Sequence, residues 1–162
     1  MISGASPGDA ARVAELLRLS MPERVVTTAG VRYYMDTARR PEDRMEWWRA
    51  ESGGELVGWA SGGLDAFAPD RTTGHATVVV HPSHRRGGVG SGLWEAVSAH
   101  LDGAGARRIL AHGHTDDDTK SFAAARGFRI AGTISTSALD PRSGRSPWHV
   151  RSRCWRRWSS GS

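Results

Sequence analysis

The spacing of hydrophobic residues changes repeatedly along the chain, and each change marks the end of one predicted element. Apolar residues recur every three or four positions in four stretches, which predicts helices at residues 6–20, 28–39, 88–101 and 116–126. Between them, alternating or continuous apolar runs predict strands at residues 1–5, 44–51, 55–62, 75–81, 108–112, 128–139 and 148–155. This alternation predicts an α/β (α+β) fold with a central sheet of about six or seven strands flanked by about four helices.

Residues with strong local preferences support several of these boundaries. Ser6 followed by Pro7 predicts a helix start, because Ser caps helix N-termini and Pro fits the first helical position. The glycine pair at residues 53–54 predicts the tight turn of a β-hairpin. Gly127 predicts the end of the helix at residues 116–126, since glycine favours the left-handed conformation that follows many helices.

The C-terminal segment alternates with period two, which predicts that it is the last strand of the sheet. One face is mainly apolar and the other mainly basic: Trp148, Val150, Ser152 and Cys154 against His149, Arg151, Arg153 and Trp155. We expect the apolar face to cover the core or to contribute to a homodimer, with a turn at residues 140–144 before the strand. The alternative is a flexible Arg/Trp tail that stacks on nucleic-acid bases.

The distribution of charge favours the strand over the nucleic-acid tail. The net charge is +5, but residues 141–162 hold six arginines and no acid, which leaves 16 basic and 17 acidic residues before them. A strand with a solvated arginine face explains this excess without nucleic acid. Cys154 is the only cysteine, so we expect neither an internal disulfide nor a cysteine-built metal site.

Length and the absence of targeting signals give a simple expectation for the organisation of the chain. No apolar run approaches the ~20 residues that span a bilayer, and the first ten residues lack the basic and apolar segments of a secretion signal. The 162 residues suit one domain. We expect a single domain over residues 1–158, a short tail at residues 159–162, and a cytoplasmic protein without membrane contact.

The segment V-V-V-H-P-S-H-R-R-G-G-V-G-S-G-L at residues 78–93 carries the clearest chemistry. It predicts a strand buried on both faces, then a basic glycine-rich turn, then an amphipathic helix. Glycines let the backbone approach a ligand closely, and the free N–H groups of a helix N-terminus favour an anion. Arg85 and Arg86 add guanidinium donors suited to phosphate oxygens. The residues alone therefore predict a pyrophosphate site.

The spacing of the glycines narrows the choice of phosphate ligand. No Lys-Ser/Thr pair follows them, so the triphosphate-binding P-loop pattern is absent. The G-x-G-x-x-G pattern of dinucleotide sites is absent as well. Arg85, Gly88 and Gly90 form R-x-x-G-x-G after V-H-P at residues 80–82, and F-A-A-A-R-G-F follows at residues 122–128. Together these motifs resemble the acetyl-CoA-binding motif and the later helix of the GNAT acetyltransferase superfamily, and the resemblance covers most of the chain.

The resemblance implies a GNAT-like mixed, mostly antiparallel sheet and an N-acyltransferase that uses acetyl-CoA or another acyl-CoA. It implies direct attack by a primary amine of a small molecule or protein, without an acyl-enzyme. A backbone N–H near Val79 or Val80 would polarise the thioester carbonyl, on a strand that separates from its neighbour. The implied cofactor-binding residues are Val78, Val79, Val80, Arg85, Arg86, Gly87, Gly88, Val89, Gly90 and Ser91.

The chain departs from the family pattern where many members carry an acid. Ala123 replaces the tyrosine found four residues before the Gly of Gly-Phe, and Asp116 replaces an asparagine near the helix start. His112 and His114 are the candidate proton-transfer residues, because imidazole titrates near neutral pH. A structural role for both histidines is the alternative. The acids after His114 suit a helix N-terminus better than a metal, so we expect no metal.

The acceptor pocket is expected between the two N-terminal helices, the loop at residues 65–71 and the last hairpin. The aromatic residues that could line it are Trp47, Trp48, Tyr33 and Tyr34, although aromatics at such spacings also build cores. Three functions remain open: an N-acyltransferase, an acyl-CoA-binding domain without catalysis, and a nucleic-acid-binding module that uses the Arg/Trp tail.

Overall fold

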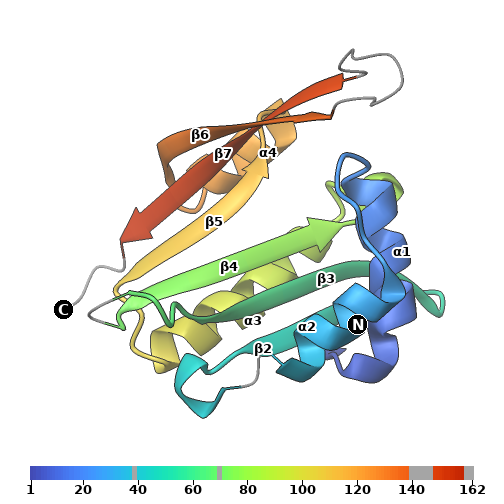
Figure 1. Ribbon diagram of the computed structural model, residues 1–162, viewed down its shortest axis with the longest axis horizontal. Helices are drawn as coiled ribbons and strands as arrows, with labels where there is room; N and C mark the ends of the chain where they lie inside the picture. The colour runs from blue at the N-terminus through green and yellow to red at the C-terminus, as the bar shows by residue number, and fades with distance from the viewer. Residues whose placement is uncertain (38–39, 69–70, 139–147, 159–162) are drawn as a thin grey trace.

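One seven-stranded sheet organises the computed structural model, which describes residues 1–37, 40–68, 71–138 and 148–158 (Figure 1). The strand order is β1-β2-β3-β4-β5-β7-β6. Only β4 and β5 pair in parallel; the other neighbours are antiparallel. The strands are β1 (Ile2–Gly4), β2 (Glu46–Ser52), β3 (Glu55–Leu64), β4 (Thr73–Val80), β5 (Arg108–His114), β6 (Arg129–Ala138) and β7 (Trp148–Trp158). The expectation of a mixed, mostly antiparallel sheet is confirmed.

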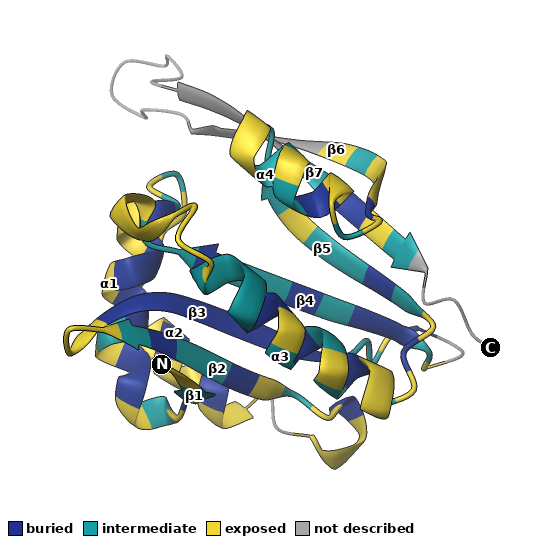
Figure 2. Cartoon of the chain, turned by 180° about the vertical axis from the view of Figure 1, so that it is seen from behind, coloured by how far each residue is buried: buried dark blue, intermediate teal, exposed yellow. Residues whose placement is uncertain are grey.

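Within the described residues, four α-helices cover the two faces of this sheet. They are α1 (Ala10–Ser20), α2 (Thr28–Thr37), α3 (Val89–Gly103) and α4 (Asp117–Ala124). Helices α1 and α2 lie on one face, and α3 and α4 lie on the other (Figures 1 and 2). Each face has its own buried cluster, one built around Leu93, Val97 and Trp155 and the other around Val13, Met35 and Trp47. Among the described residues, no helix is long and apolar enough to span a membrane.

The first helix begins slightly later than the sequence predicts. Pro7–Asp9 form a 3₁₀ turn, and α1 starts at Ala10. The carboxylate of Asp9 accepts hydrogen bonds from the Ser6 backbone N–H at 2.9 Å and from Arg49 Nη1 at 2.7 Å. These bonds fix the start of α1 to β2. At the other end of the helix, Ser20 Oγ donates to the carbonyl of Val80 at the end of β4, at 3.5 Å.

The C-terminal segment is the last strand along the chain, as predicted. β7 lies between β5 and β6 and pairs with both, and β6 forms the edge. The predicted orientation of its two faces is wrong at residues 154 and 155. Trp155, assigned to the basic face, is 5% exposed and lies in the core, whereas Cys154 is half-buried. The predicted turn at residues 140–144 lies outside the described residues.

The burial of Trp155 predicts that this arginine-rich segment contributes to stability. Trp155→Ala should lower the free energy of unfolding by ~3–5 kcal/mol, the usual cost of removing a buried tryptophan. Arg156→Ala changes the exposed neighbour and should cost under ~1 kcal/mol. Urea denaturation followed by circular dichroism measures both. Equal stability of the Trp155 variant and the wild type would show that the segment is a dispensable tail.

Candidate active site

The candidate active site begins where β4 and β5 stop pairing. Their parallel register runs from Thr73 opposite Arg108 to Ala76 opposite Ala111. β4 continues to Val80 and β5 continues to His114, and the two strands diverge (Figure 1). A cleft of about 1020 Å³ opens between them, lined by β4, β5, the glycine turn, α3, α4 and the loop after α1. This volume is in the range of pockets that bind small molecules and cofactors.

The free edge of β4 presents alternate backbone groups to this cleft. The N–H of Asp65 donates to the carbonyl of Thr73 at 2.8 Å, and the N–H of His81 donates to the carbonyl of Val57 at 2.9 Å. The register between β3 and β4 is uniform, so odd-numbered residues of β4 bond to β3. Even-numbered Val78 and Val80 therefore direct their N–H and C=O groups away from β3, toward the cleft.

This register corrects one expectation drawn from the sequence. Val79 directs its N–H toward β3 and cannot offer it to a ligand in the cleft. The carbonyl of Val80 accepts hydrogen bonds from Ser20 Oγ at 3.5 Å and from Arg85 Nε at 3.4 Å. Of the two residues that the sequence suggested, only Val80 presents its N–H to the cleft. Val78 and Val80 are half-buried because they line the cleft, whereas the sequence predicted a strand buried on both faces.

The glycine turn joins β4 to α3, as predicted. Gly88 is the N-cap residue of α3 with φ +83°, a conformation that favours glycine. A Cβ atom at Gly90 would lie 3.1 Å from the Phe122 ring and 3.5 Å from Val80, so a side chain here would crowd α4. The first N–H groups of α3 have no carbonyl partner within the helix and can bind an anion.

Most of the predicted cofactor-binding residues gather at this wall of the cleft. Eight of the ten line it: Val78, Val79, Val80, Arg85, Arg86, Gly88, Gly90 and Ser91. Gly87 and Val89 are outside the lining. The two predicted arginines differ in their contacts, because Arg86 forms an ion pair with Asp118 of α4 at 3.1 Å whereas Arg85 bonds only the Val80 carbonyl in the described structure.

A third arginine, which the sequence reasoning did not single out, lies at the same wall. Arg126 follows α4, and its Nη2 donates to Ser91 Oγ in the first turn of α3 at 2.8 Å. Its guanidinium carbon lies 3.6 Å from the centre of the Phe122 ring. In the sequence, Arg126 is an isolated arginine before Gly127 with no motif of its own. Its position beside α3 depends on how α4 packs, which the sequence does not reveal.

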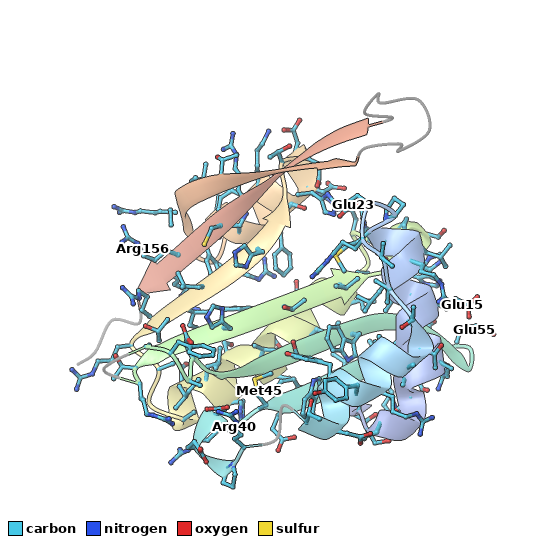
Figure 3. All side chains as sticks on the ribbon, in the orientation of Figure 1. Glu15, Glu23, Arg40, Met45, Glu55 and Arg156 are labelled. Carbon is cyan, nitrogen blue, oxygen red and sulfur yellow. The ribbon has the colours of Figure 1, made fainter. Side chains whose placement is uncertain are left out.

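The predicted histidines lie across the cleft from β4, on β5. Ile109 and Ala111 pack into the core on the α3 and α4 side, so His112 and His114 point to the α1 and α2 side. The Nε2 atom of His114 lies 3.3 Å from Oε1 of Glu23, whose side chain is 13% exposed. Glu23 belongs to the loop after α1 and reaches toward β5 (Figure 3). Sequence reasoning missed it because an acid in a loop carries no periodic signal.

Burial and nearby positive charge change the acid–base properties of His112. Partial burial lowers the pKa of His112 below its ordinary value of about 6.5. The positive charges of His75 and Arg24 lower this pKa further. His112 is therefore neutral at pH 7 and has a lone pair that can accept a proton. In the sheet, His112 lies opposite Cys154 of β7, a residue distant from it in the sequence.

The aromatic residues expected to line the acceptor pocket lie outside the cleft between β4 and β5. Trp47 is 1% exposed and packs edge-on against Tyr34 with ring centres 6.2 Å apart. Trp48 contacts His100, and Tyr33 is 69% exposed on α2. None of these four is among the described residues that line the cleft. The cleft takes its aromatic lining from Trp94, Phe122, Phe128 and Trp155 instead.

A sheet that opens between two parallel strands, with a glycine turn leading from one of them into a helix, defines the GNAT class of fold. The model of the acetyltransferase (GNAT) family matches residues 11–128. The chain belongs to this family. No curated protein matches the chain significantly.

Solved structures of similar proteins have the same fold. An N-acetyltransferase from Staphylococcus aureus Mu50 has a TM-score of 0.78 at 16% identity, covering 98% of this chain and 97% of that one. The yncA protein of Salmonella typhimurium, solved with its cofactor acetyl-CoA, has a TM-score of 0.75 at 20% identity, covering 100% and 95%. A ribosomal-protein-alanine N-acetyltransferase from Brucella melitensis has a TM-score of 0.73 at 18% identity, covering 98% and 99%.

The electrostatic environment of His112 gives a prediction that needs no substrate. Arg24→Gln removes one positive charge near the imidazole and should raise the pKa of His112 toward its ordinary value. Arg32→Gln, an exposed substitution on α2, should leave it unchanged. NMR titration of the histidine ring protons measures both. A wild-type His112 that titrates at or above about 6.5 would contradict this description of the site.

Proposed function

We propose that this protein is an N-acyltransferase that transfers an acetyl or other acyl group from acyl-CoA to a primary amine. The observation that carries the proposal is the cleft between β4 and β5, whose one wall joins the free edge of β4 to the anion-binding start of α3. This wall therefore offers free N–H and C=O groups for the pantetheine amides and helix N–H groups for the pyrophosphate. The acetyl-CoA bound to the yncA protein, which shares the fold, supports the choice of cofactor.

The residues that line the cleft fit acyl-CoA in one orientation, with its pyrophosphate at the start of α3. The N–H groups at the start of α3, next to Gly88 and Gly90, would hold the pyrophosphate, with Arg85 beside them. The pantetheine amides would pair with the free N–H and C=O groups of Val78 and Val80. The thioester then lies toward the point where β4 and β5 meet. Val78, two residues beyond the last paired residue Ala76, is nearer to that point than Val80, so its N–H would be placed to stabilise the oxyanion that forms when an amine attacks.

Proton transfer would take place at the other wall. A primary amine is protonated at neutral pH and must lose a proton before it attacks, and the departing thiolate must gain one. His112 and His114 face this part of the cleft, and Glu23 holds His114. The acceptor, a small-molecule or protein amine, would approach past the loop at residues 21–27. We propose that residues 1–158 form this one acyltransferase domain.

One observation favours a second candidate, an acyl-CoA-binding domain with little or no catalysis. Ala123 lines the cleft at the position where many family members carry a tyrosine, and its methyl group cannot donate a proton. The described tyrosines, Tyr33 and Tyr34, lie on α2 and outside the cleft lining. A nucleic-acid-binding tail is less well supported, because Trp155 is buried and cannot stack on a base.

Binding of the cofactor tests the first part of the proposal. Acetyl-CoA should raise the melting temperature, since a ligand that binds only the folded state stabilises it. Gly88→Glu and Gly90→Glu should each abolish the shift by placing a side chain and a negative charge at the pyrophosphate site. Gly103→Glu, at the far end of α3 where a Cβ meets no atom within 4 Å, should keep it. Normal binding by both variants would refute the assignment.

Turnover with an amine library tests the second part and separates the two candidates. Release of free CoA by the wild type supports an acyltransferase, and binding without release supports the binding domain. His112→Ala or His114→Ala should lower turnover by ~10²–10⁴-fold while the Kd for acetyl-CoA changes little. His100→Ala, at the far end of α3, is the matched control. Unchanged rates in both variants would remove the two histidines from the mechanism.

A further inference from the structure

Arg126 crosses from α4 to the first turn of α3 and lies at the end of the cleft that suits phosphate. Its Nη2 donates to Ser91 Oγ at 2.8 Å, and its Nη1 donates to the carbonyl of Phe122 at 3.0 Å. Ser91 is the third residue of α3, so the guanidinium is fixed beside the N–H groups that begin this helix. Both Arg126 and Ser91 line the cleft.

The charge of Arg126 is poorly compensated within the described residues. No described carboxylate lies within ion-pair distance of its guanidinium, and its buried Nε has no hydrogen-bond partner there. Burial lowers the pKa of Arg126, and only the more distant Glu95 opposes this effect. The Phe122 ring under the guanidinium gives partial compensation. A partly buried cation with so little counter-charge is suited to an anionic ligand.

Arg86 shows the opposite situation, although the sequence motif points to it. Its side chain is 74% exposed and already pairs with Asp118 at 3.1 Å. A phosphate would have to displace this carboxylate or share the cation with it. The guanidinium of Arg126 offers five N–H donors, of which the described bonds use two, and needs no such exchange.

We propose that Arg126 binds a pyrophosphate oxygen of acyl-CoA and supplies, with Arg85 and the start of α3, the charge that holds it. The inference rests on the proposed function, because it assumes that the cleft takes acyl-CoA. Ser91 acts as a positioning residue: its hydroxyl holds the guanidinium against α3. The contribution of Arg86 is smaller, because Asp118 competes for it.

Calorimetric titration tests this assignment with acetyl-CoA and with its 3′-dephospho form. Arg126→Gln should raise the Kd for both ligands equally, by about tenfold or more, since a charge-assisted hydrogen bond is lost. Arg86→Gln should raise the Kd less. Arg129→Gln, which removes an exposed arginine of β6, should not change it. Both ligands keep the pyrophosphate, so the comparison separates it from the 3′-phosphate.

Two results would overturn the inference: an unchanged Kd for Arg126→Gln, or a loss confined to the ligand that carries the 3′-phosphate. If Arg126→Gln fails to fold, Ser91→Ala provides the test, because it frees the guanidinium without removing its charge. Ser91→Ala should weaken binding of both ligands by a few-fold, and unchanged binding would again refute the role. A wild-type protein that binds neither ligand would instead refute the proposed function itself, and this inference with it.

Discussion

Hydrogen bonding between β4 and β5 ends at Ala76 and Ala111, although both strands continue for several residues. Beyond that point the backbone groups of Val78 and Val80 have no strand partner on one side. Backbone N–H and C=O groups rarely stay unpaired in protein interiors, because their desolvation is costly. The separation of the strands therefore creates both the volume of the cleft and a row of donors and acceptors for an extended ligand with its own amides.

The charges around the cleft differ between its two walls. The wall formed by β4, α3 and the end of α4 has the start of α3, Arg85 and Arg126, all of which favour an anion. The wall formed by β5 and the loop after α1 has Glu23 and two histidines, which can accept protons. In the proposed complex, the phosphates of acyl-CoA would lie at the start of α3, and the free edge of β4 would carry the pantetheine arm toward the point where β4 and β5 meet.

Local patterns in the sequence predicted the elements and the glycine turn, because these depend on neighbouring residues. Gly88, for example, marks a left-handed N-cap that its own sequence context specifies. The contacts between distant segments were not predictable in this way. The pairing of Arg86 with Asp118 and the contact of Glu23 with His114 join residues far apart in the chain. Likewise, the register of β7 on β5 pairs Trp155 with Ala111, which packs on the core side, and so Trp155 rather than Cys154 enters the core.

Protonating the departing thiolate, the role of the missing tyrosine, is the smaller chemical problem in the proposed reaction. Removing the proton from the ammonium group is the larger one. A thiol has an ordinary pKa of about 8.5, so a departing thiolate is a weak base that water can protonate. A lysine-like ammonium has a pKa of about 10.4, roughly four units above that of a histidine, which corresponds to ~5 kcal/mol. A histidine base such as His112 can take this proton only where the site also lowers the pKa of the amine. Burial and the positive charges of His75 and Arg24 lower the pKa of His112. The same features would favour the neutral form of an amine bound beside it, so in the proposed reaction one electrostatic environment would keep both the base and its substrate neutral.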